Sequence, residues 1–372
     1  MLSISRTSDS ILSKWWWTVD RPLLFSFVLM IVIGVFLAMA ATPMVANHIG
    51  IDQFHFLKRH LLFIIPSLMV IFVISNMSYT NIRKFALVLF FAALFLTLLT
   101  LFFGAEIKGA RRWISFLGLS IQPSEFCKPA LTILVAWMFS EERNNSQVNG
   151  RAIGAFLYFL VAFLLVMQPD VGMLFVTTAV FGIQLFLNGL PLFFVFASIF
   201  AGVSGLGLAY LFLPHVTVRV NKFLDPAAGD HYQINRSLEA FSRGGLFGVG
   251  PGEGVVKKHL PDAHADFVFS VLGEEFGFFV CVLVVILIGF VVLYGMNRAL
   301  KEHNMFALLS SVGLLSQFGL QSFINMASSL HLIPTKGMTL PFMSYGGSSM
   351  LAISIVVGLI LAFNRRRSLE EE

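Results

Sequence analysis

The chain has 372 residues, of which 57% are apolar and 12% are charged. Soluble globular domains are about 45–50% apolar and about 25% charged, so the composition excludes an ordinary soluble domain and indicates a membrane protein. The net charge of +5 is not concentrated in a basic stretch with interleaved aromatic residues, so nucleic-acid binding is not indicated.

Apolar runs of about 20 residues recur along the chain and predict an all-α polytopic membrane protein with ten spans. The expected spans are 22–42, 57–75, 85–103, 122–140, 152–167, 171–188, 192–213, 267–295, 304–327 and 341–363. Only Gln168-Pro169-Asp170 separates the fifth from the sixth, which fits a hairpin tip or a broken helix. Ala38-Met39-Ala40 resembles a cleavage site, but the first run is long enough to span, and we expect it to be retained.

Ten spans place both termini on one side of the membrane, but the charges do not decide which side by count. Twelve Lys and Arg residues fall on each side, and Lys128 completes the total of 25. The basic terminal tails, 1–21 and 364–372, favour cytoplasmic termini. The opposite face then carries more positive charge than orientation explains, which suits an anionic ligand or lipid headgroups.

A long hydrophilic loop, 214–266, lies between the seventh and eighth spans. It contains four of the nine histidines and twelve of the 45 charged residues. Within it Ile234, Leu238 and Phe241 recur at helical spacing, which predicts a short amphipathic helix at the membrane surface. Six glycines fall within 244–254 and could cradle a phosphate, but the strand and helix of a dinucleotide site are missing, and a hinge fits equally well.

Asp266 is the sharpest candidate for a catalytic residue, because it lies where this loop re-enters an apolar run. A carboxylate is electrostatically favoured at a helix N-terminus, although an ordinary N-cap has the same appearance. Asp262 and His264 are nearby alternatives. Together with His259 these residues could form a metal site, but their spacing matches no standard ligand template.

Further candidates lie at the outer ends of the spans. Lys128 falls inside the fourth span, where an ionisable group is costly and usually paired. Its expected partner is one of three carboxylates: Glu125, Asp170 or Asp266. A short basic outer loop precedes Trp113 and contains Lys108, Arg111 and Arg112. In the ninth span we expect interhelical hydrogen bonds from Gln317, Gln321 and Asn325.

Five short motifs together resemble the SEDS family of cell-wall polymerases, which includes FtsW and RodA. They are Lys108-Gly109-Ala110-Arg111-Arg112-Trp113, Gln122-Pro123-Ser124-Glu125 with Lys128, Gln168-Pro169-Asp170, Leu260-Pro261-Asp262-Ala263-His264-Ala265-Asp266-Phe267 and Pro341-Phe342-Met343-Ser344-Tyr345-Gly346-Gly347-Ser348-Ser349. The similarity covers nearly the whole chain in the family's order. Each motif is weak alone, but jointly they are specific. The stretch from Trp15 to Leu24 and the run Leu272-Gly273-Glu274-Glu275 are more similar to the FtsW branch.

The resemblance implies a single transmembrane domain over residues 1–372, with ten helices, cytoplasmic termini and a large external loop between helices seven and eight. It implies a peptidoglycan glycosyltransferase that polymerises lipid II during cell division, in the bacterial inner membrane at the septum. The implied partners are a class B penicillin-binding protein, an FtsI-like transpeptidase, and other divisome proteins. The alternatives are a RodA-like role in elongation, a lipid II flippase, and a division scaffold without catalysis.

The resemblance also assigns site residues, with Asp266 in place of the family's key aspartate. Its implied role is general base in an inverting transfer. The candidate substrate-binding residues are Lys108, Arg111, Arg112, Lys128, Glu125, Arg219, His264, Ser344 and Ser348. Leaving-group charge would be met by basic residues or by Mg²⁺ or another divalent cation, and the sequence does not choose. Lys128 next to Asp266 would lower the pKa of that carboxyl and weaken it as a base.

Two positions depart from the family pattern. Ala265 stands where Thr is usual, and Asp262 stands where Glu is frequent. A hydroxyl that could orient Asp266 is therefore absent at position 265.

Overall fold

The computed structural model describes residues 10–49, 55–107, 110–116, 119–194, 232–334 and 337–366, with isolated residues between 197 and 221. The helices are α1 Ile11–Thr18, α2 Arg21–Ile49, α3 His55–Ser75, α4 Tyr79–Phe103, α5 Ser124–Asn144, α6 Gly150–Met167, α7 Val171–Leu187, α10 Tyr232–Gly244, the 3₁₀ helix η1 Val256–His259, α11 Val268–Ala299, α12 Met305–Ser329 and α13 Gly347–Phe363. The strands are β1 Ala105–Ile107, β2 Ala110–Phe116 and β3 Leu119–Ile121.

The helices occur where nine of the ten spans were predicted. In the described part of the chain, six of them are long and apolar enough to cross a membrane, namely α2, α3, α4, α6, α11 and α12, and α7 and α13 are shorter apolar helices. The seventh expected span, 192–213, and the first part of the long loop lie largely outside the described residues. A mostly helical membrane protein is therefore confirmed, and the count of ten spans stays a prediction.

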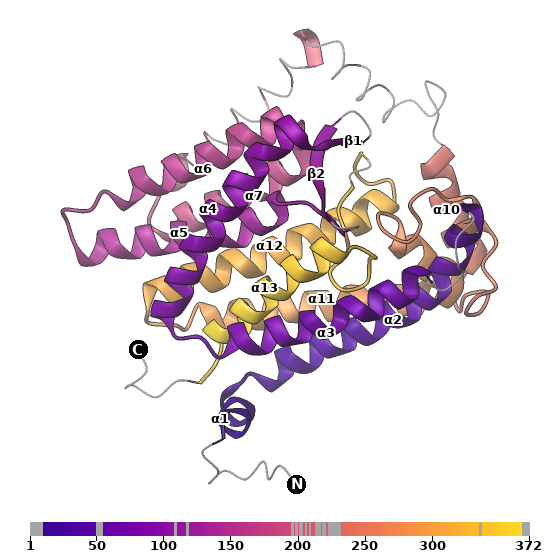
Figure 1. Cartoon of the computed structure of the whole chain (residues 1–372), viewed down its shortest axis with the longest axis horizontal. Helices are drawn as coiled ribbons and strands as arrows, with labels where there is room; N and C mark the ends of the chain where they lie inside the picture. The colour runs from indigo at the N-terminus through magenta and orange to yellow at the C-terminus, as the bar shows by residue number, and fades with distance from the viewer. Residues whose placement is uncertain are drawn as a thin grey trace.

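The core of the bundle is built around α12 and α13 (Figure 1). Nearly every side chain of α13 is buried, and Gly347 and Gly358 let it approach α3, where a Cβ would meet Phe63 and Ile74 within 3 Å. Small residues at a helix interface allow such close packing. Outer helices instead expose large apolar side chains, as α4 does with Phe91 and Phe103, which face lipid.

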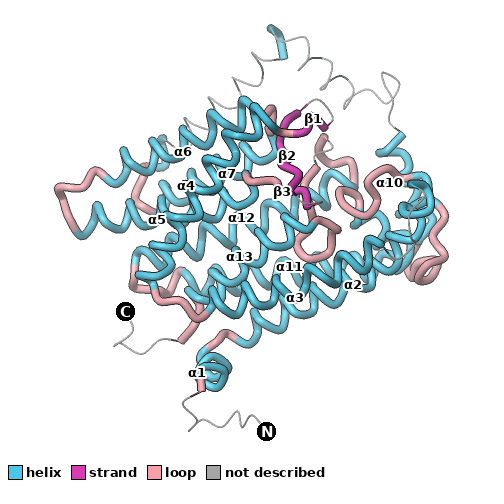
Figure 2. Tube along the Cα trace, in the orientation of Figure 1, coloured by secondary structure: helices cyan, strands magenta, loops and turns pink. Residues whose placement is uncertain are grey.

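The two ends of the bundle differ in structure (Figure 2). The helix α1 and the C-terminal end of α13 lie at one end, whereas the strands, α10 and most of the long turns gather at the other. The basic loop before the fourth span, which the sequence did not predict as strand, forms a three-stranded antiparallel sheet in the order β1-β2-β3. Pairs such as Glu106 with Arg111 and Ile114 with Ile121 set its register.

The eighth span was expected as one helix over 267–295, but α11 is broken at Gly277. That glycine has φ 79° and ψ −176°, which a residue with a Cβ adopts only with strain. The backbone of the glycine-rich loop fills the break, because the amide N–H of Phe278 donates to the Gly245 carbonyl at 2.9 Å and Phe279 donates to Leu246 at 3.3 Å. The first part of α11, which follows Asp266, is thereby held apart from the rest of the span.

Candidate active site

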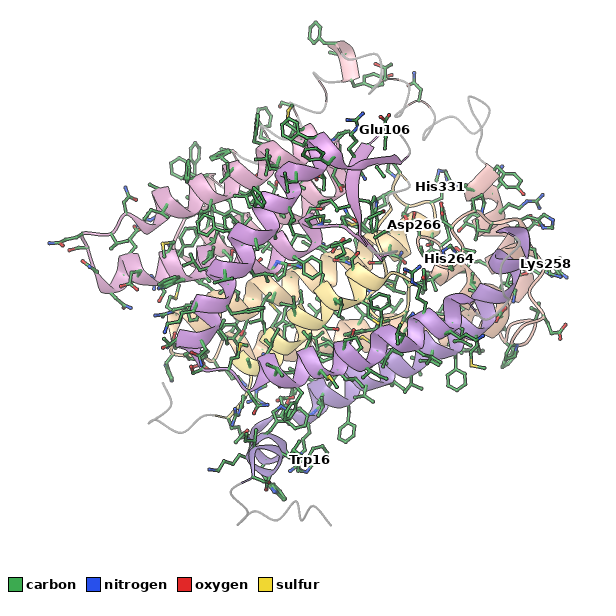
Figure 3. All side chains as sticks on the ribbon, in the orientation of Figure 1. Trp16, Glu106, Lys258, His264, Asp266 and His331 are labelled. Atoms are coloured by element: carbon green, nitrogen blue, oxygen red, sulfur yellow. The ribbon has the colours of Figure 1, made fainter. Side chains whose placement is uncertain are left out.

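Asp266 lies near the end of the turn 261–267, which leads into α11. Its amide N–H donates to the Asp262 carbonyl at 3.0 Å, which closes the turn. Its half-buried carboxylate faces Gly337, where an added Cβ would lie 3.2 Å from Oδ2. Figure 3 shows Asp266 and His264 close together, at the end of the bundle away from Trp16.

Two amides on α12 fix the segment that faces Asp266. Asn325 Nδ2 donates to the Asp266 carbonyl at 3.0 Å and to the Met338 carbonyl at 2.6 Å. One helical turn earlier, Gln321 Nε2 donates to the Thr339 carbonyl at 3.2 Å. Asn325 therefore ties the segment 337–340 to the turn 261–267, and Gln321 holds the same segment on α12. The expected interhelical hydrogen bond is confirmed for Gln321, which accepts from Lys128 of α5. Asn325 instead bonds to non-helical backbone, and Gln317 Oε1 has no hydrogen-bond partner among the described residues.

Lys128 is buried and fully engaged by neighbouring polar groups. Its Nζ lies 3.0 Å from Glu125 Oε2 and 3.0 Å from Gln321 Oε1, and the side chain is 2% exposed. Of the three carboxylates expected as its partner, Glu125 is the one at ion-pair distance, three residues away on the same helix. Through Gln321 this pair is linked to Thr339, opposite Asp266.

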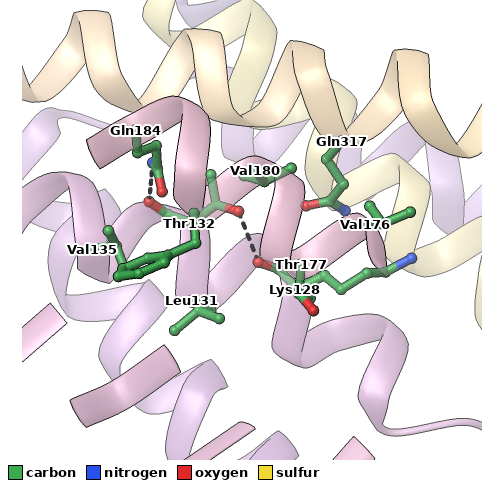
Figure 4. Close-up of a pocket in the computed structure, with 10 residues that line it drawn as sticks. Lys128, Leu131, Thr132, Val135, Val176, Thr177, Val180, Gln184 and Gln317 are labelled. Atoms are coloured by element: carbon green, nitrogen blue, oxygen red, sulfur yellow. Dashed lines mark hydrogen bonds between the residues drawn. The ribbon is translucent and has the colours of Figure 1, made fainter. Parts of the chain in front are cut away.

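Figure 4 shows the small cavity that Lys128 borders. The cavity has a volume of about 10 Å³, which holds about one water molecule. The cavity is lined by residues of α5, α7 and α12: Lys128, Leu131, Thr132, Val135, Val176, Thr177, Val180, Phe181, Gln184 and Gln317. A pyrophosphate does not fit in this cavity.

Arg112 binds the break between α6 and α7. Its Nε donates to the Gln168 carbonyl at 3.1 Å, its Nη2 donates to the Pro169 carbonyl at 2.7 Å, and Nη1 lies 3.5 Å from Asp170 Oδ2. Two sequence motifs more than fifty residues apart thus form one structural joint. Arg111 points elsewhere: it is 49% exposed and lies 3.5 Å from Glu106. Two further candidates, Lys108 and Arg219, lie outside the described residues.

The motif that leads into α13 also binds the turn 261–267. Ser344 Oγ donates to the Ala265 carbonyl at 2.6 Å, and the amide N–H of Tyr345 donates to the His264 carbonyl at 2.8 Å. The rings of His264 and Tyr345 lie 5.5 Å apart. Burial lowers the pKa of His264, and the Asp262 charge opposes that shift. The Ser348 hydroxyl is buried and has no hydrogen-bond partner among the described residues.

A buried ionic cluster lies between η1, α11 and α2, and the sequence did not predict it. Lys257 on η1 pairs with Glu275 on α11 and donates to the Ala40 carbonyl of α2 at 2.9 Å. Beside it the Glu274 carboxylate accepts three backbone amides, from Val255 at 2.7 Å, Val256 at 2.7 Å and Lys257 at 2.9 Å. The available signal was two adjacent acids inside an apolar run, which such a run rarely tolerates unpaired.

The glycine-rich loop is anchored to this cluster. The amide N–H groups of Val249 and Gly250 donate to the carbonyls of Glu274 and Glu275, each at 3.0 Å. Gly248 lies so close that a Cβ would be 2.1 Å from the Glu275 carbonyl oxygen. These two amides are therefore occupied by the protein's own acceptors, which leaves them unavailable to a phosphate.

Within the described residues, no three His, Cys, Asp or Glu side chains are placed to hold a metal ion together. The four residues considered for such a site, His259, Asp262, His264 and Asp266, are thus not gathered into one ligand set. Asp262 and Asp266 are the carboxylates of the turn 261–267. A Mg²⁺ ion usually binds through one or two carboxylates together with substrate phosphates, so a single carboxylate of this turn is enough to meet that smaller requirement.

The chain matches a family model described as FTSW_RODA_SPOVE, cell cycle protein, over residues 21–369. It is 43% identical over 366 residues to a "Probable peptidoglycan glycosyltransferase FtsW" of Caulobacter vibrioides, covering 98% of this chain and 94% of that one. A protein of the same name from Tolumonas auensis is 36% identical and is matched over 95% of this chain and 96% of its own length.

Two solved structures have a similar fold. One is named "Structural coordination of polymerization and crosslinking by a peptidoglycan synthase complex"; it has a TM-score of 0.78 and 28% identity, covering 93% of this chain and 97% of that chain. The other is the rod shape determining protein RodA of Thermus thermophilus, with a TM-score of 0.69, 28% identity and coverage of 94% and 97%.

Proposed function

The chain belongs to the FtsW, RodA and SpoVE family of cell cycle proteins, and from that premise we propose that Asp266 is the general base of its glycosyl transfer. The enzyme is a peptidoglycan glycosyltransferase that acts in cell division and polymerises lipid II. One observation supports the role of Asp266 most strongly. Its turn is held by Asn325, Ser344 and the amide of Tyr345, which leaves a half-buried carboxylate on a fixed backbone.

The proposed reaction inverts the donor sugar. The 4-hydroxyl of the acceptor sugar attacks the anomeric carbon of the α-linked donor, and the bond to the lipid pyrophosphate breaks. Asp266 accepts the hydroxyl proton as the new β-glycosidic bond forms, so no covalent enzyme intermediate is needed. A positioned base of this kind contributes typically 10²–10⁴-fold in rate.

The departing pyrophosphate needs positive charge, and the contacts of the basic residues divide them into two groups. Arg111 is exposed and only loosely paired, so we assign it to the leaving group together with Lys108 and Arg219. Arg112 and Lys128 are engaged by the protein itself and act as positioning residues. When a divalent cation is bound, Asp262 or Asp266 would hold it, and it would supply the same charge neutralisation.

We further propose ten spans, with the long loop external and both termini cytoplasmic. The FtsW names of the relatives favour the septum over the lateral wall. The similar solved structure is a peptidoglycan synthase complex that couples polymerization to crosslinking. A class B penicillin-binding protein is accordingly the proposed partner, and other divisome proteins complete the assembly.

The test separates a polymerase from a lipid II flippase. Purified protein with its transpeptidase partner is given fluorescent lipid II in proteoliposomes, and both glycan strands and transbilayer movement are measured. Glycan strands from the wild type, and none from Asp266→Asn at equal thermal stability, would support the proposal. Transbilayer movement without polymer would overturn it, and so would the absence of polymer from the wild type, as expected of a scaffold. Unchanged polymerisation in the variant would overturn the assignment of Asp266 as the base.

A further inference from the structure

We propose that the end of the bundle opposite Asp266 contains a binding site for the phosphate headgroup of an anionic lipid. A cavity of about 230 Å³ lies where α11 and α13 end and α12 begins. It is lined by Arg298, Ala299, Lys301, Glu302, Ser311, Phe363, Asn364 and Arg365. This volume is below the roughly 300–1,000 Å³ of sites for drug-sized ligands, which suits a headgroup rather than a whole soluble cofactor.

The lining favours an anion that also carries hydroxyl groups. Arg298, Lys301 and Arg365 bring three positive charges from two different helix ends, against two negative charges, one from Glu302 in the lining and one from Asp20, which pairs with Arg298. Phosphate oxygens are well matched by guanidinium and ammonium donors. The Glu302 carboxylate and the Ser311 hydroxyl can in turn bind glycerol hydroxyls, so phosphatidylglycerol is the lipid that fits best.

Contacts within the protein hold two of the basic side chains at the rim of this cavity. The Arg298 guanidinium pairs with Asp20 at the start of α2, and Tyr294 Oη donates to the same carboxylate at 3.2 Å. On the other side Arg365 Nε donates to Thr18 Oγ1 at 2.6 Å, and the next amide, of Arg366, donates to the Thr18 carbonyl at 2.9 Å. Because α1, α2, α11 and α13 meet here, Asp20 and Thr18 hold Arg298 and Arg365 at the cavity, and a phosphate would bind through the guanidinium N–H groups that these contacts do not use.

The neighbouring residues place the cavity at headgroup depth. The helix α1, which ends at Thr18, carries Trp15, Trp16 and Trp17. The Arg21 guanidinium lies 5.3 Å from the ring centroid of Trp16 and 4.8 Å from that of Trp17. Clustered tryptophans beside arginine are typical of the membrane–water interface. The phosphate source nearest to this depth is a lipid headgroup, and basic pockets between helices at this level bind such lipids.

The experiment uses the full chain in a neutral detergent and counts bound lipid by native mass spectrometry. The probes are dioleoylphosphatidylglycerol and dioleoylphosphatidylcholine, with inorganic phosphate at millimolar concentration as a competitor. The test variant is Lys301→Gln with Arg365→Gln, and Lys301→Gln alone serves as a milder variant at an exposed position. The control, Lys84→Gln with Arg143→Gln, removes two cations from other helices at the same end of the bundle.

A basic residue near an anionic headgroup contributes about 1 kcal/mol, or about fivefold in affinity. Lys301→Gln should therefore weaken phosphatidylglycerol binding about fivefold and the double variant roughly 25-fold, while the control variant stays within about twofold of the wild type. Equal weakening in the control, or unchanged binding in both test variants, would overturn the site. Displacement of the lipid by inorganic phosphate would assign the cavity to a soluble phosphate instead and overturn the lipid assignment.

Discussion

Neutralising one partner of the buried Lys257–Glu275 pair should destabilise the protein strongly. The two side chains are 1% and 0% exposed, so Glu275→Gln leaves the Lys257 ammonium in an apolar interior with the Ala40 carbonyl as its remaining acceptor. Removing one partner of a buried ion pair costs about 3–5 kcal/mol. Lys257→Met should cost a similar amount. The double variant should lose only about 1–3 kcal/mol, because no unpaired charge remains.

The measurement is the apparent melting temperature in detergent, followed through a double-mutant cycle. At about 2 °C per kcal/mol, each single variant should melt roughly 6–10 °C below the wild type and the double variant several degrees above either single one. The exposed Glu253, in the same loop, supplies the matched control Glu253→Gln, which should melt like the wild type. A single variant that melts within about 1 °C of the wild type would refute the reasoning, and so would strictly additive losses.

Three further predictions follow from the same contacts. Burial lowers the pKa of His264 below 6.5, so the stabilising contribution of this residue is complete above that pH and declines as the pH falls. His264→Gln should therefore flatten the dependence of melting temperature on pH between about pH 7 and 5. Equal slopes in the variant and the wild type would contradict this. Gly277→Ala places a Cβ 2.3 Å from the Gly248 nitrogen at a positive φ and should lower the free energy of unfolding by at least about 2 kcal/mol. The control Gly289→Ala has open space in the same helix and should not lower it. Equal melting temperatures of the two variants would refute the break as a fixed feature. Lys128→Met should slow polymerisation at least about tenfold, and so should the double variant with Glu125→Gln, in which no unpaired carboxylate remains. Rates equal to that of the wild type would show that the Lys128–Glu125 pair has no positioning role.

The sequence predicted the helix α10 but gave no indication of the side that packs against the protein. The helical spacing of Ile234, Leu238 and Phe241 predicted the helix correctly, and the residues buried against the protein are Ser237, Ala240 and Gly244. The reason is a backbone approach that hydrophobic periodicity does not reveal. A Cβ at Gly244 would lie 1.9 Å from the Gly273 carbonyl oxygen, so small residues are required where the helix meets α11.

Whether a contact of the site could be predicted depended on how far apart its two residues lie in the sequence. Glu125 lies three residues before Lys128 on one helix, so spacing alone made it a candidate partner. Arg112 and Asp170 are far apart in the chain, and the cluster at Glu274 requires the break at Gly277, which no local pattern showed. Local spacing therefore gave candidates, whereas tertiary packing chose among them.

The most direct test of the central claim is the initial rate of glycan synthesis by Asp266→Asn, compared with Asp262→Asn in the same turn. Both variants should match the wild type in melting temperature, so that a change in rate reports on chemistry. If Asp266 is the base, its variant should be at least about 100-fold slower, with Asp262→Asn within about tenfold of the wild type. An Asp266→Asn enzyme that keeps a rate within about tenfold of the wild type would contradict the account.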